Sequence, residues 1–328
     1  MADKKKVLVM GSSSFGGASF VNFILNKNNY KVYGTYRAKK PKVYLPYLDN
    51  KNIKKFKNFK IDLLKDSKKL YKLIKKIRPN YIVDFASICI VNPSWLFPDI
   101  YASTNVNSKI KIIKNLNNFS FLKKYIYIST PEIFGTSNNQ IKENSNFFNP
   151  STPYATSKLN AEFLLKNYFS SFKAPIIIAR FANFYGPGQP LNRLIPKVIF
   201  SIQNNKKFPL EGKGESIRGY IYSHDFCNGI FKIMTKGKLG NTYHFSQRNF
   251  YSVMDVIKTI CKTKKYSLKK LIIFKKDRIG KDKCYKLDTY KAVKFLKWKN
   301  KFSLKDGIKE IIKYQNKKNK DYLDLVKY

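Results

Sequence analysis

The chain has 328 residues, of which 43% are hydrophobic and 16% are aromatic, and its formal net charge is +45. This length and apolar content exclude an intrinsically disordered chain and allow one large domain or two closely joined domains. No run of about eighteen uncharged apolar residues occurs, and the charged start leads directly into an apolar strand. We therefore expect no membrane span, no signal peptide and a cytoplasmic protein.

The strong positive charge raises the question of nucleic-acid binding. The lysines are spread over every segment, however, and no basic stripe or base-stacking motif stands out. We therefore expect no specific nucleic-acid partner, although the charge should attract polyanions such as nucleoside diphosphates. Four scattered cysteines, Cys89, Cys227, Cys261 and Cys284, form no Cys-x-x-Cys pair, so we expect neither a metal site nor a disulfide framework.

The first predicted unit is an apolar strand over residues 5–10, a turn of glycines and small residues at 11–17, and an amphipathic helix to residue 25. This arrangement directs the amides of a helix N-terminus at a pyrophosphate. Gly11 and Gly17 have the spacing of a dinucleotide-binding turn, with Ser14 at the middle position and Phe15 after it. These four residues are candidate cofactor contacts; the alternative is a structural tight turn.

The second predicted strand, residues 30–37, ends in Arg37 rather than in an acidic residue. An acidic residue there binds the ribose 2′-hydroxyl of NAD, whereas arginine suits the 2′-phosphate of NADP. We therefore expect NAD or NADP, with a slight preference for NADP, unless Arg37 is only a solvated surface residue. Further strands are predicted over 59–64, 81–87, 124–128 and 174–180, and their alternation with helices indicates an α/β fold with a doubly wound parallel sheet.

A tyrosine and a lysine share one face of the helix predicted to begin near Ser151, Thr152 and Pro153. Tyr154 and Lys158 are four residues apart, which places the ammonium close to the phenol oxygen. A fixed positive charge stabilises the phenolate and lowers the pKa of the tyrosine toward working pH. The pair is therefore a candidate base, and the alternative is an ordinary helix start.

Together, the glycine turn and the Tyr-x-x-x-Lys pair resemble the extended short-chain dehydrogenase/reductase superfamily, the NAD-dependent epimerase/dehydratase family. Its dinucleotide turn reads Gly-x-x-Gly-x-x-Gly, so Ser14 replaces the middle glycine here. Five further segments are similar to those of nucleoside-diphosphate-sugar 4,6-dehydratases of the dTDP-glucose and GDP-mannose type. They are residues 129–135, 180–188, 193–196, 212–218 and 277–282.

The resemblance implies a Rossmann domain over residues 1–182, to which 217–237 would return, and a smaller mixed α/β substrate domain over 183–216 and 238–328. It also implies a homodimer and a bound nicotinamide dinucleotide. The cofactor residues it adds are Asp62 and Leu63 beside the adenine, Ala86 along the cofactor, and Tyr154 and Lys158 at the nicotinamide end. The implied contacts to a nucleoside-diphosphate sugar are Ser87, Asn183, Arg193, Arg218 and Arg278, of which the arginines suit a diphosphate.

For the reaction, the resemblance implies that Tyr154 takes the proton of the sugar C4 hydroxyl while hydride leaves C4. Thr130 would hold the C4 oxygen, and Glu132 would remove the C5 proton. Water would then leave from C6, and hydride would return there to give a 4-keto-6-deoxy sugar. Pro131 stands where glucose-type dehydratases have an aspartate that protonates the leaving hydroxyl.

That departure leaves other activities open. A C4 epimerase and a UDP-glucuronate decarboxylase-like enzyme share the oxidation step, and an epimerase needs no C5 base. A non-catalytic Rossmann protein that binds RNA or a protein partner is a further alternative, against which the intact Thr130, Tyr154 and Lys158 argue.

Overall fold

The computed structural model describes residues 3–37, 45–277 and 279–317. Its main sheet has seven strands in the order β11-β7-β5-β4-β1-β2-β3, and every pairing is parallel. The strands are β1 (Lys5–Met10), β2 (Tyr30–Tyr36), β3 (Phe56–Lys60), β4 (Tyr81–Asp84), β5 (Lys124–Ser129), β7 (Ile176–Phe181) and β11 (Thr242–Phe245). The predicted doubly wound α/β sheet is therefore confirmed.

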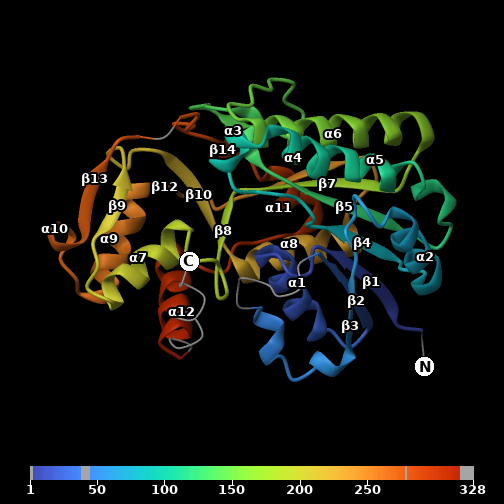
Figure 1. Ribbon diagram of the computed structural model, residues 1–328, viewed down its shortest axis with the longest axis horizontal. Coiled ribbons are helices and arrows are strands. Elements are labelled where there is room, and N and C mark those ends of the chain that lie inside the picture. The colour runs from blue at the N-terminus through green and yellow to red at the C-terminus, as the bar shows by residue number, and fades with distance from the viewer. Residues whose placement is uncertain (1–2, 38–44, 278, 318–328) are drawn as a thin grey trace.

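Helices cover both faces of this sheet (Figure 1). On one face lie α2 (Ser67–Ile77), α3 (Pro93–Leu96), α4 (Pro98–Ala102), α5 (Ser108–Ile113) and α6 (Pro153–Phe172), and on the other α1 (Phe15–Leu25), α8 (Ser223–Lys236) and α11 (Tyr290–Leu296). The spacing of α2 shows why: its buried residues Leu70, Ile74 and Ile77 recur every three or four positions and form one apolar stripe. Each face thus has its own hydrophobic core.

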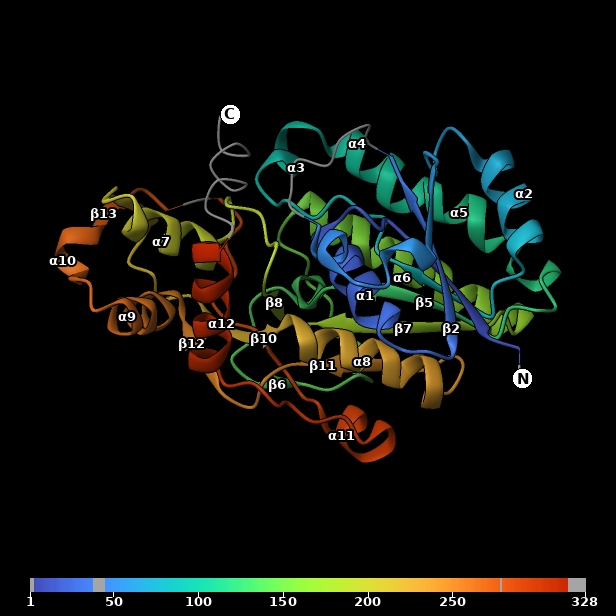
Figure 2. The ribbon, with the colours of Figure 1, turned by 90° about the horizontal axis from the view of Figure 1, so that it is seen from below.

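A second, smaller group of elements lies beside one end of the main sheet (Figures 1 and 2). Its three-stranded sheet contains β12 (Phe250–Ser252), β10 (Ile217–Tyr222) and β8 (Asn183–Tyr185), and β13 (Ile272–Lys275) pairs with β9 (Phe208–Glu211). The helices of the group are α7 (Leu194–Gln203), α9 (Val253–Lys264), α10 (Leu268–Leu271) and α12 (Leu304–Lys317). Apolar side chains from these elements form a separate core.

Shorter elements complete the described chain. They are the pair β6 (Gln140–Ile141) and β14 (Lys286–Leu287), a π-helical turn at Ser103–Asn107, and 3₁₀ turns at Pro46–Asp49, Ile53–Lys55, Leu116–Asn118 and Pro131–Phe134. None of the helices within the described ranges combines the length and the apolarity that a membrane crossing requires.

Two predicted strands end earlier than expected. β3 ends at Lys60 rather than at residue 64, because the Asp62 carboxylate accepts hydrogen bonds from the amides of Leu64 and Lys65 and so turns the chain. β4 ends at Asp84 rather than at residue 87, because the Asp84 carboxylate accepts from the amide of Ala86.

The division of the chain between the two groups of elements is more interleaved than the sequence suggested. β11 lies within the range 238–328 expected for the substrate domain, yet it pairs with β7 at the edge of the main sheet. β10 opens the range expected to return to the first domain, and it pairs with β8 and β12 in the smaller sheet. The domain boundaries themselves stay a prediction.

Candidate active site

The glycine turn follows β1 at the point where the strand order reverses, between β1 and β4. In such sheets ligands bind at the carboxyl ends of the strands beside this switch point. Gly11 has a φ of +77°, and a Cβ there would lie 2.9 Å from the amide nitrogen of Ala86. A Cβ on Gly17 would lie 2.2 Å from the carbonyl oxygen of Gly11. Both positions therefore require glycine, and the turn has the close backbone packing that a bound dinucleotide needs.

Ser14 differs from these glycines because its φ of −76° is open to any residue. It is the N-cap of α1: its hydroxyl accepts from the amide of Gly17 at 3.1 Å and donates to the carbonyl of Gly11 at 2.7 Å. The serine thus stabilises the turn that a middle glycine would otherwise form. The first turn of α1 keeps the positive end of its dipole next to the switch point, which suits a pyrophosphate.

The other predicted cofactor residues follow the carboxyl ends of neighbouring strands. Phe15 stacks on Phe184 of β8, with ring centroids 5.1 Å apart, so it is also a contact between the two groups of elements. Arg37 directly follows β2 and is exposed. Leu63 is buried, and the carboxylate of Asp62 is bound in the turn after β3.

Tyr154 lies in the first turn of α6. The helix starts as predicted, with Pro153 at its first position and the Thr152 hydroxyl accepting from the amide of Ala155 at 3.2 Å. The Tyr154 side chain is only 6% exposed, and its ring packs edge-on against Tyr101. The cap and the proline set where the helix begins, and thereby where the phenol lies relative to the end of β5.

The pKa of Tyr154 is held well above its ordinary value by burial and, next, by the negative charge of Glu132. A hydrogen bond with Thr130 and the charge of Arg193 act in the opposite direction. This differs from the expectation that Lys158 brings the tyrosine close to working pH. The reason is desolvation, which outweighs the hydrogen bond with Thr130 and the charge of Arg193 and keeps the phenol protonated.

Thr130 and Glu132 follow β5 and flank Pro131. Thr130 caps the short helical turn Pro131–Phe134: its hydroxyl accepts from the amide of Glu132 at 3.3 Å and lies 3.5 Å from a Glu132 carboxylate oxygen. Thr130 is 7% exposed, and Pro131 is buried as the first residue of the turn. The structure therefore brings Thr130, Glu132 and Tyr154 together at the carboxyl edge of the sheet.

Lys158, one turn further along α6, is 3% exposed. Its ammonium donates to the Ser87 hydroxyl at 3.1 Å and to the Ile128 carbonyl at 2.8 Å, and it lies 4.1 Å from the centre of the Tyr127 ring. Burial, and next the positive charge of Lys109, lowers the pKa of Lys158 to about 7. Ser87, predicted as a substrate contact, is therefore a hydrogen-bond partner of Lys158 in this structure.

The predicted substrate arginines lie in different surroundings. Arg193, the N-cap of α7, donates to the carbonyl of Cys89 at 3.0 Å, and its charge acts on Tyr154. Arg218 on β10 is 6% exposed; it donates to the carbonyls of Ile217 and Asp282. Arg278 lies outside the described residues.

Tyr285 is a site residue that the sequence motifs did not reveal. Its hydroxyl donates to the Asn183 side-chain oxygen at 3.0 Å, and the guanidinium of Arg218 lies 4.1 Å above the centre of its ring. Burial is the main cause that raises the pKa of Tyr285, and the charge of Glu132 acts in the same direction. Tyr285 therefore contacts both Asn183 and Arg218 and lies within the electrostatic influence of Glu132. An aromatic residue between two lysine-rich stretches carries no recognisable signal.

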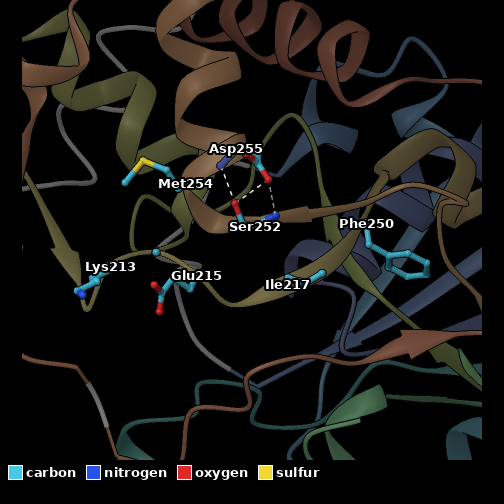
Figure 3. A pocket seen from close by; sticks show the side chains of 8 residues that line it. Lys213, Glu215, Ile217, Phe250, Ser252, Met254 and Asp255 are labelled. Atoms are coloured by element: carbon cyan, nitrogen blue, oxygen red, sulfur yellow. Dashed lines mark hydrogen bonds between the residues drawn. The ribbon is translucent and has the colours of Figure 1, made fainter. Parts of the chain in front are cut away.

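A pocket of about 370 Å³ opens in the smaller group of elements (Figure 3). Its lining residues are Lys213, Gly214, Glu215, Ile217, Phe250, Ser252, Met254 and Asp255. Four of these belong to the loop 212–218 that was predicted to hold a diphosphate, and the lining includes none of Thr130, Glu132, Tyr154 and Lys158. The pocket thus adjoins β10, which carries Arg218, rather than the region of Thr130, Glu132, Tyr154 and Lys158.

Known proteins are similar to this chain in sequence and architecture. Residues 8–311 match the family model described as GDP-mannose 4,6 dehydratase. A dTDP-D-glucose 4,6-dehydratase of Dictyostelium discoideum is 32% identical over 282 residues, which cover 79% of this chain and 63% of that protein.

Two solved structures are similar over nearly their whole length. The dTDP-glucose 4,6-dehydratase of Bacillus anthracis str. Ames in complex with NAD superposes with a TM-score of 0.87 at 24% identity, over 98% of this chain and 99% of that one. The UDP-glucuronic acid 4-epimerase of Bacillus cereus, in complex with UDP-glucuronic acid and NAD, gives a TM-score of 0.85 at 25% identity, over 95% and 99%. The chain therefore belongs to the GDP-mannose 4,6 dehydratase family, within the NAD-dependent epimerase/dehydratase group of extended short-chain dehydrogenases/reductases.

Proposed function

We propose that the protein is a nucleoside-diphosphate-sugar 4,6-dehydratase, which oxidises C4, eliminates water across C5 and C6, and reduces C6 to give a 4-keto-6-deoxy sugar. The observation that carries the proposal is the carboxylate of Glu132, which lies beside Thr130 and is close enough to Tyr154 to raise its pKa. A base at this position serves removal of the C5 proton, a step that C4 epimerisation does not require.

Tyr154 takes the C4 hydroxyl proton in this proposal, and the site contains the groups that control when it can. Because burial keeps the phenol protonated, additional positive charge next to the ring is needed to lower the pKa of Tyr154 and allow the phenolate to form. The charge of Arg193 already acts in this direction, and Lys158 lies one turn further along α6. Thr130, which already hydrogen-bonds Tyr154, orients the C4 hydroxyl so that proton transfer follows a short path.

We infer that the glycine turn and the first turn of α1 hold the pyrophosphate of a nicotinamide dinucleotide, with Lys158 at the nicotinamide ribose. When bound, this cofactor supplies the hydride acceptor and donor of the reaction. The two solved relatives were crystallised with NAD. Arg37, exposed directly after β2, could instead bind the 2′-phosphate of NADP. Both NAD and NADP should therefore be tested as cofactors.

The substrate end of the site is proposed to run from Tyr154 toward β8 and β10. Arg193 and Arg218 supply guanidinium groups for the diphosphate, and Asn183, held by Tyr285, faces the sugar nucleotide. We also propose that the smaller group of elements selects the nucleotide and that the enzyme is a homodimer.

Pro131 requires a different source for the proton that leaves with the C6 hydroxyl. It is buried at the start of a helical turn and has no proton to give. Glu132, once it has taken the C5 proton, is the nearest carboxyl group along the chain and can return that proton to C6 directly or through a water. Glu132 then performs both halves of the elimination, and a proton from solvent adds to C5 when hydride returns to C6.

A C4 epimerase is the second candidate. The 25% identity and TM-score of 0.85 to the UDP-glucuronic acid 4-epimerase favour it, as does the missing acid at Pro131. A UDP-glucuronate decarboxylase-like reaction shares the same oxidation. A protein that binds RNA through its +45 charge is less well supported, because buried Thr130, Tyr154 and Lys158 form a polar site that such binding does not need.

One experiment separates these candidates. The protein is incubated in deuterated water with dTDP-, GDP-, CDP- and UDP-hexoses and with UDP-glucuronate, each with NAD or NADP. The dehydratase gives a 4-keto product with deuterium at C5. Interconversion of C4 epimers without C5 exchange assigns the protein to the epimerases, and release of carbon dioxide assigns it to the decarboxylases.

A further inference from the structure

A buried ion pair lies close to Lys158, the lysine of the proposed catalytic pair. Asp84, the last residue of β4, and Lys109 on α5 are both 0% exposed. The Lys109 ammonium lies 2.8 Å from one oxygen of the Asp84 carboxylate and 3.0 Å from the other. The hydroxyl of Tyr125 on β5 also donates to this carboxylate. Taking two charges out of water is costly, so the pair invites an explanation beyond packing.

Both members of the pair form hydrogen bonds with the backbone of the segment that follows β4. Lys109 donates to the Ala86 carbonyl at 2.6 Å, and the Asp84 carboxylate accepts from the Ala86 amide at 2.8 Å. Both polar groups of one peptide residue are thus bound by the pair. The same residue faces the glycine turn, because a Cβ on Gly11 would lie 2.9 Å from the Ala86 nitrogen.

The next residue along this segment, Ser87, binds Lys158. The Ser87 hydroxyl accepts a hydrogen bond from the Lys158 ammonium at 3.1 Å. Ser87 directly follows Ala86, the residue whose backbone Asp84 and Lys109 bind. We propose that Asp84 and Lys109 are positioning residues for Lys158, which hold the Ala86–Ser87 segment between the glycine turn and the catalytic ammonium. This inference rests on the proposed function only for the role of Lys158.

The pair also acts on Lys158 through charge. Lys109 lowers the pKa of Lys158, second to burial, and Asp84 raises it. The other groups that act on the ammonium are Glu162 on α6, Cys89 in the loop after β4, and the ring of Tyr127 on β5. The two members of the pair therefore shift the pKa of Lys158 in opposite directions, so removing either charge should be visible in the titration of the lysine.

The test measures NADH affinity against pH by fluorescence, for the wild-type protein and the variants Lys109→Met and Asp84→Asn. We expect each variant to weaken NADH binding by about tenfold, the effect of one misplaced charge-assisted hydrogen bond. The midpoint of the pH dependence should rise in Lys109→Met, because a neighbouring cation is gone. It should fall in Asp84→Asn, because a neighbouring anion is gone.

Either single variant leaves one buried charge without its partner and is at risk of unfolding. The double variant Asp84→Asn/Lys109→Met removes both charges and keeps the volume, so it should fold, bind NADH weakly and titrate near the wild-type midpoint. Asp225→Asn is the matched control. Asp225 is also 0% exposed, but its carboxylate accepts from the amides of Lys301 and Phe302, away from Lys158. It should lower the unfolding midpoint without moving the pH dependence.

Wild-type NADH affinity and an unchanged pH midpoint in the double variant and in whichever single variants fold would overturn the inference. So would midpoints that move in the same direction in both single variants. Because NADH binding needs no turnover of a sugar nucleotide, an enzyme that fails every dehydratase assay still gives a clear result here. A wild type that binds no NADH would overturn the inference together with the cofactor assignment.

Discussion

The hydroxyl of Thr130 lies 3.5 Å from a carboxylate oxygen of Glu132 and accepts a hydrogen bond from the Glu132 amide at 3.3 Å. The threonine thereby ties the proposed C5 base to the same hydroxyl that hydrogen-bonds Tyr154. In the proposed reaction, the proton transfers at C4 and at C5 would both take place beside the Thr130 side chain.

Glu132→Gln should lower the rate of dehydration by a factor of about 100 to 10,000, the usual contribution of a general base. The amide keeps the shape of the side chain but cannot accept the C5 proton. The measurement is formation of the 4-keto-6-deoxy product together with deuterium at C5. Exposed Glu310→Gln is the matched control and should be as active as the wild type. Unchanged elimination by Glu132→Gln would remove Glu132 from the mechanism.

Tyr154→Phe should reduce turnover by at least about 100-fold while the dinucleotide still binds. The ring and its edge-on packing against Tyr101 remain, and only the hydroxyl is lost. Steady-state rates and NADH titration of the same preparation measure the two effects separately. Normal turnover with the true substrate would exclude Tyr154 as the base.

Lys158→Met should stabilise the cofactor-free protein at pH 6, by on the order of 1–3 kcal/mol in the free energy of unfolding. The pKa of Lys158 is about 7 in the folded protein and 10.5 ordinarily, so below pH 7 the folded state bears the full cost of a buried charge. Between pH 7 and 10.5 the unfolded chain holds more protons than the folded one, so wild-type stability rises with pH and the advantage of the variant shrinks. Urea unfolding at pH 6 and pH 10 measures both. A difference that stays constant with pH would contradict the low pKa.

Arg37→Ala should weaken NADP binding by about 1 kcal/mol or more and leave NAD binding unchanged, if the guanidinium binds a 2′-phosphate. Titration of both reduced dinucleotides measures the two affinities. Equal effects on NAD and NADP would identify Arg37 as a general surface charge, in agreement with the NAD held by the solved relatives.

Interactions between residues close in sequence were sufficient to predict much of the fold and of the candidate site. The strand-turn-helix at Gly11, the cap and proline that begin α6, and the alternation of strands and helices depend on short-range sterics and hydrogen bonding, which neighbouring residues determine. The motifs around Thr130, Tyr154 and Lys158 likewise lie within single segments, so the sequence alone predicted them and the family. The ends of β3 and β4 were mispredicted, because apolar residues continue past Asp62 and Asp84 and hide the turns that these carboxylates form with nearby amides.

Tertiary structure decided what depends on burial and on partners far apart in the chain. Tyr285 meets Asn183 across 102 positions, and Lys109 meets Asp84 across 25, so no periodicity or spacing could reveal either contact. The protonation of the site is decided in the same way. Spacing alone suggested a lysine that lowers the pKa of Tyr154, whereas the folded chain desolvates both groups, raising the pKa of the phenol and lowering that of the ammonium. Desolvation is a property of everything packed around a residue, which is why it first becomes visible in the folded molecule.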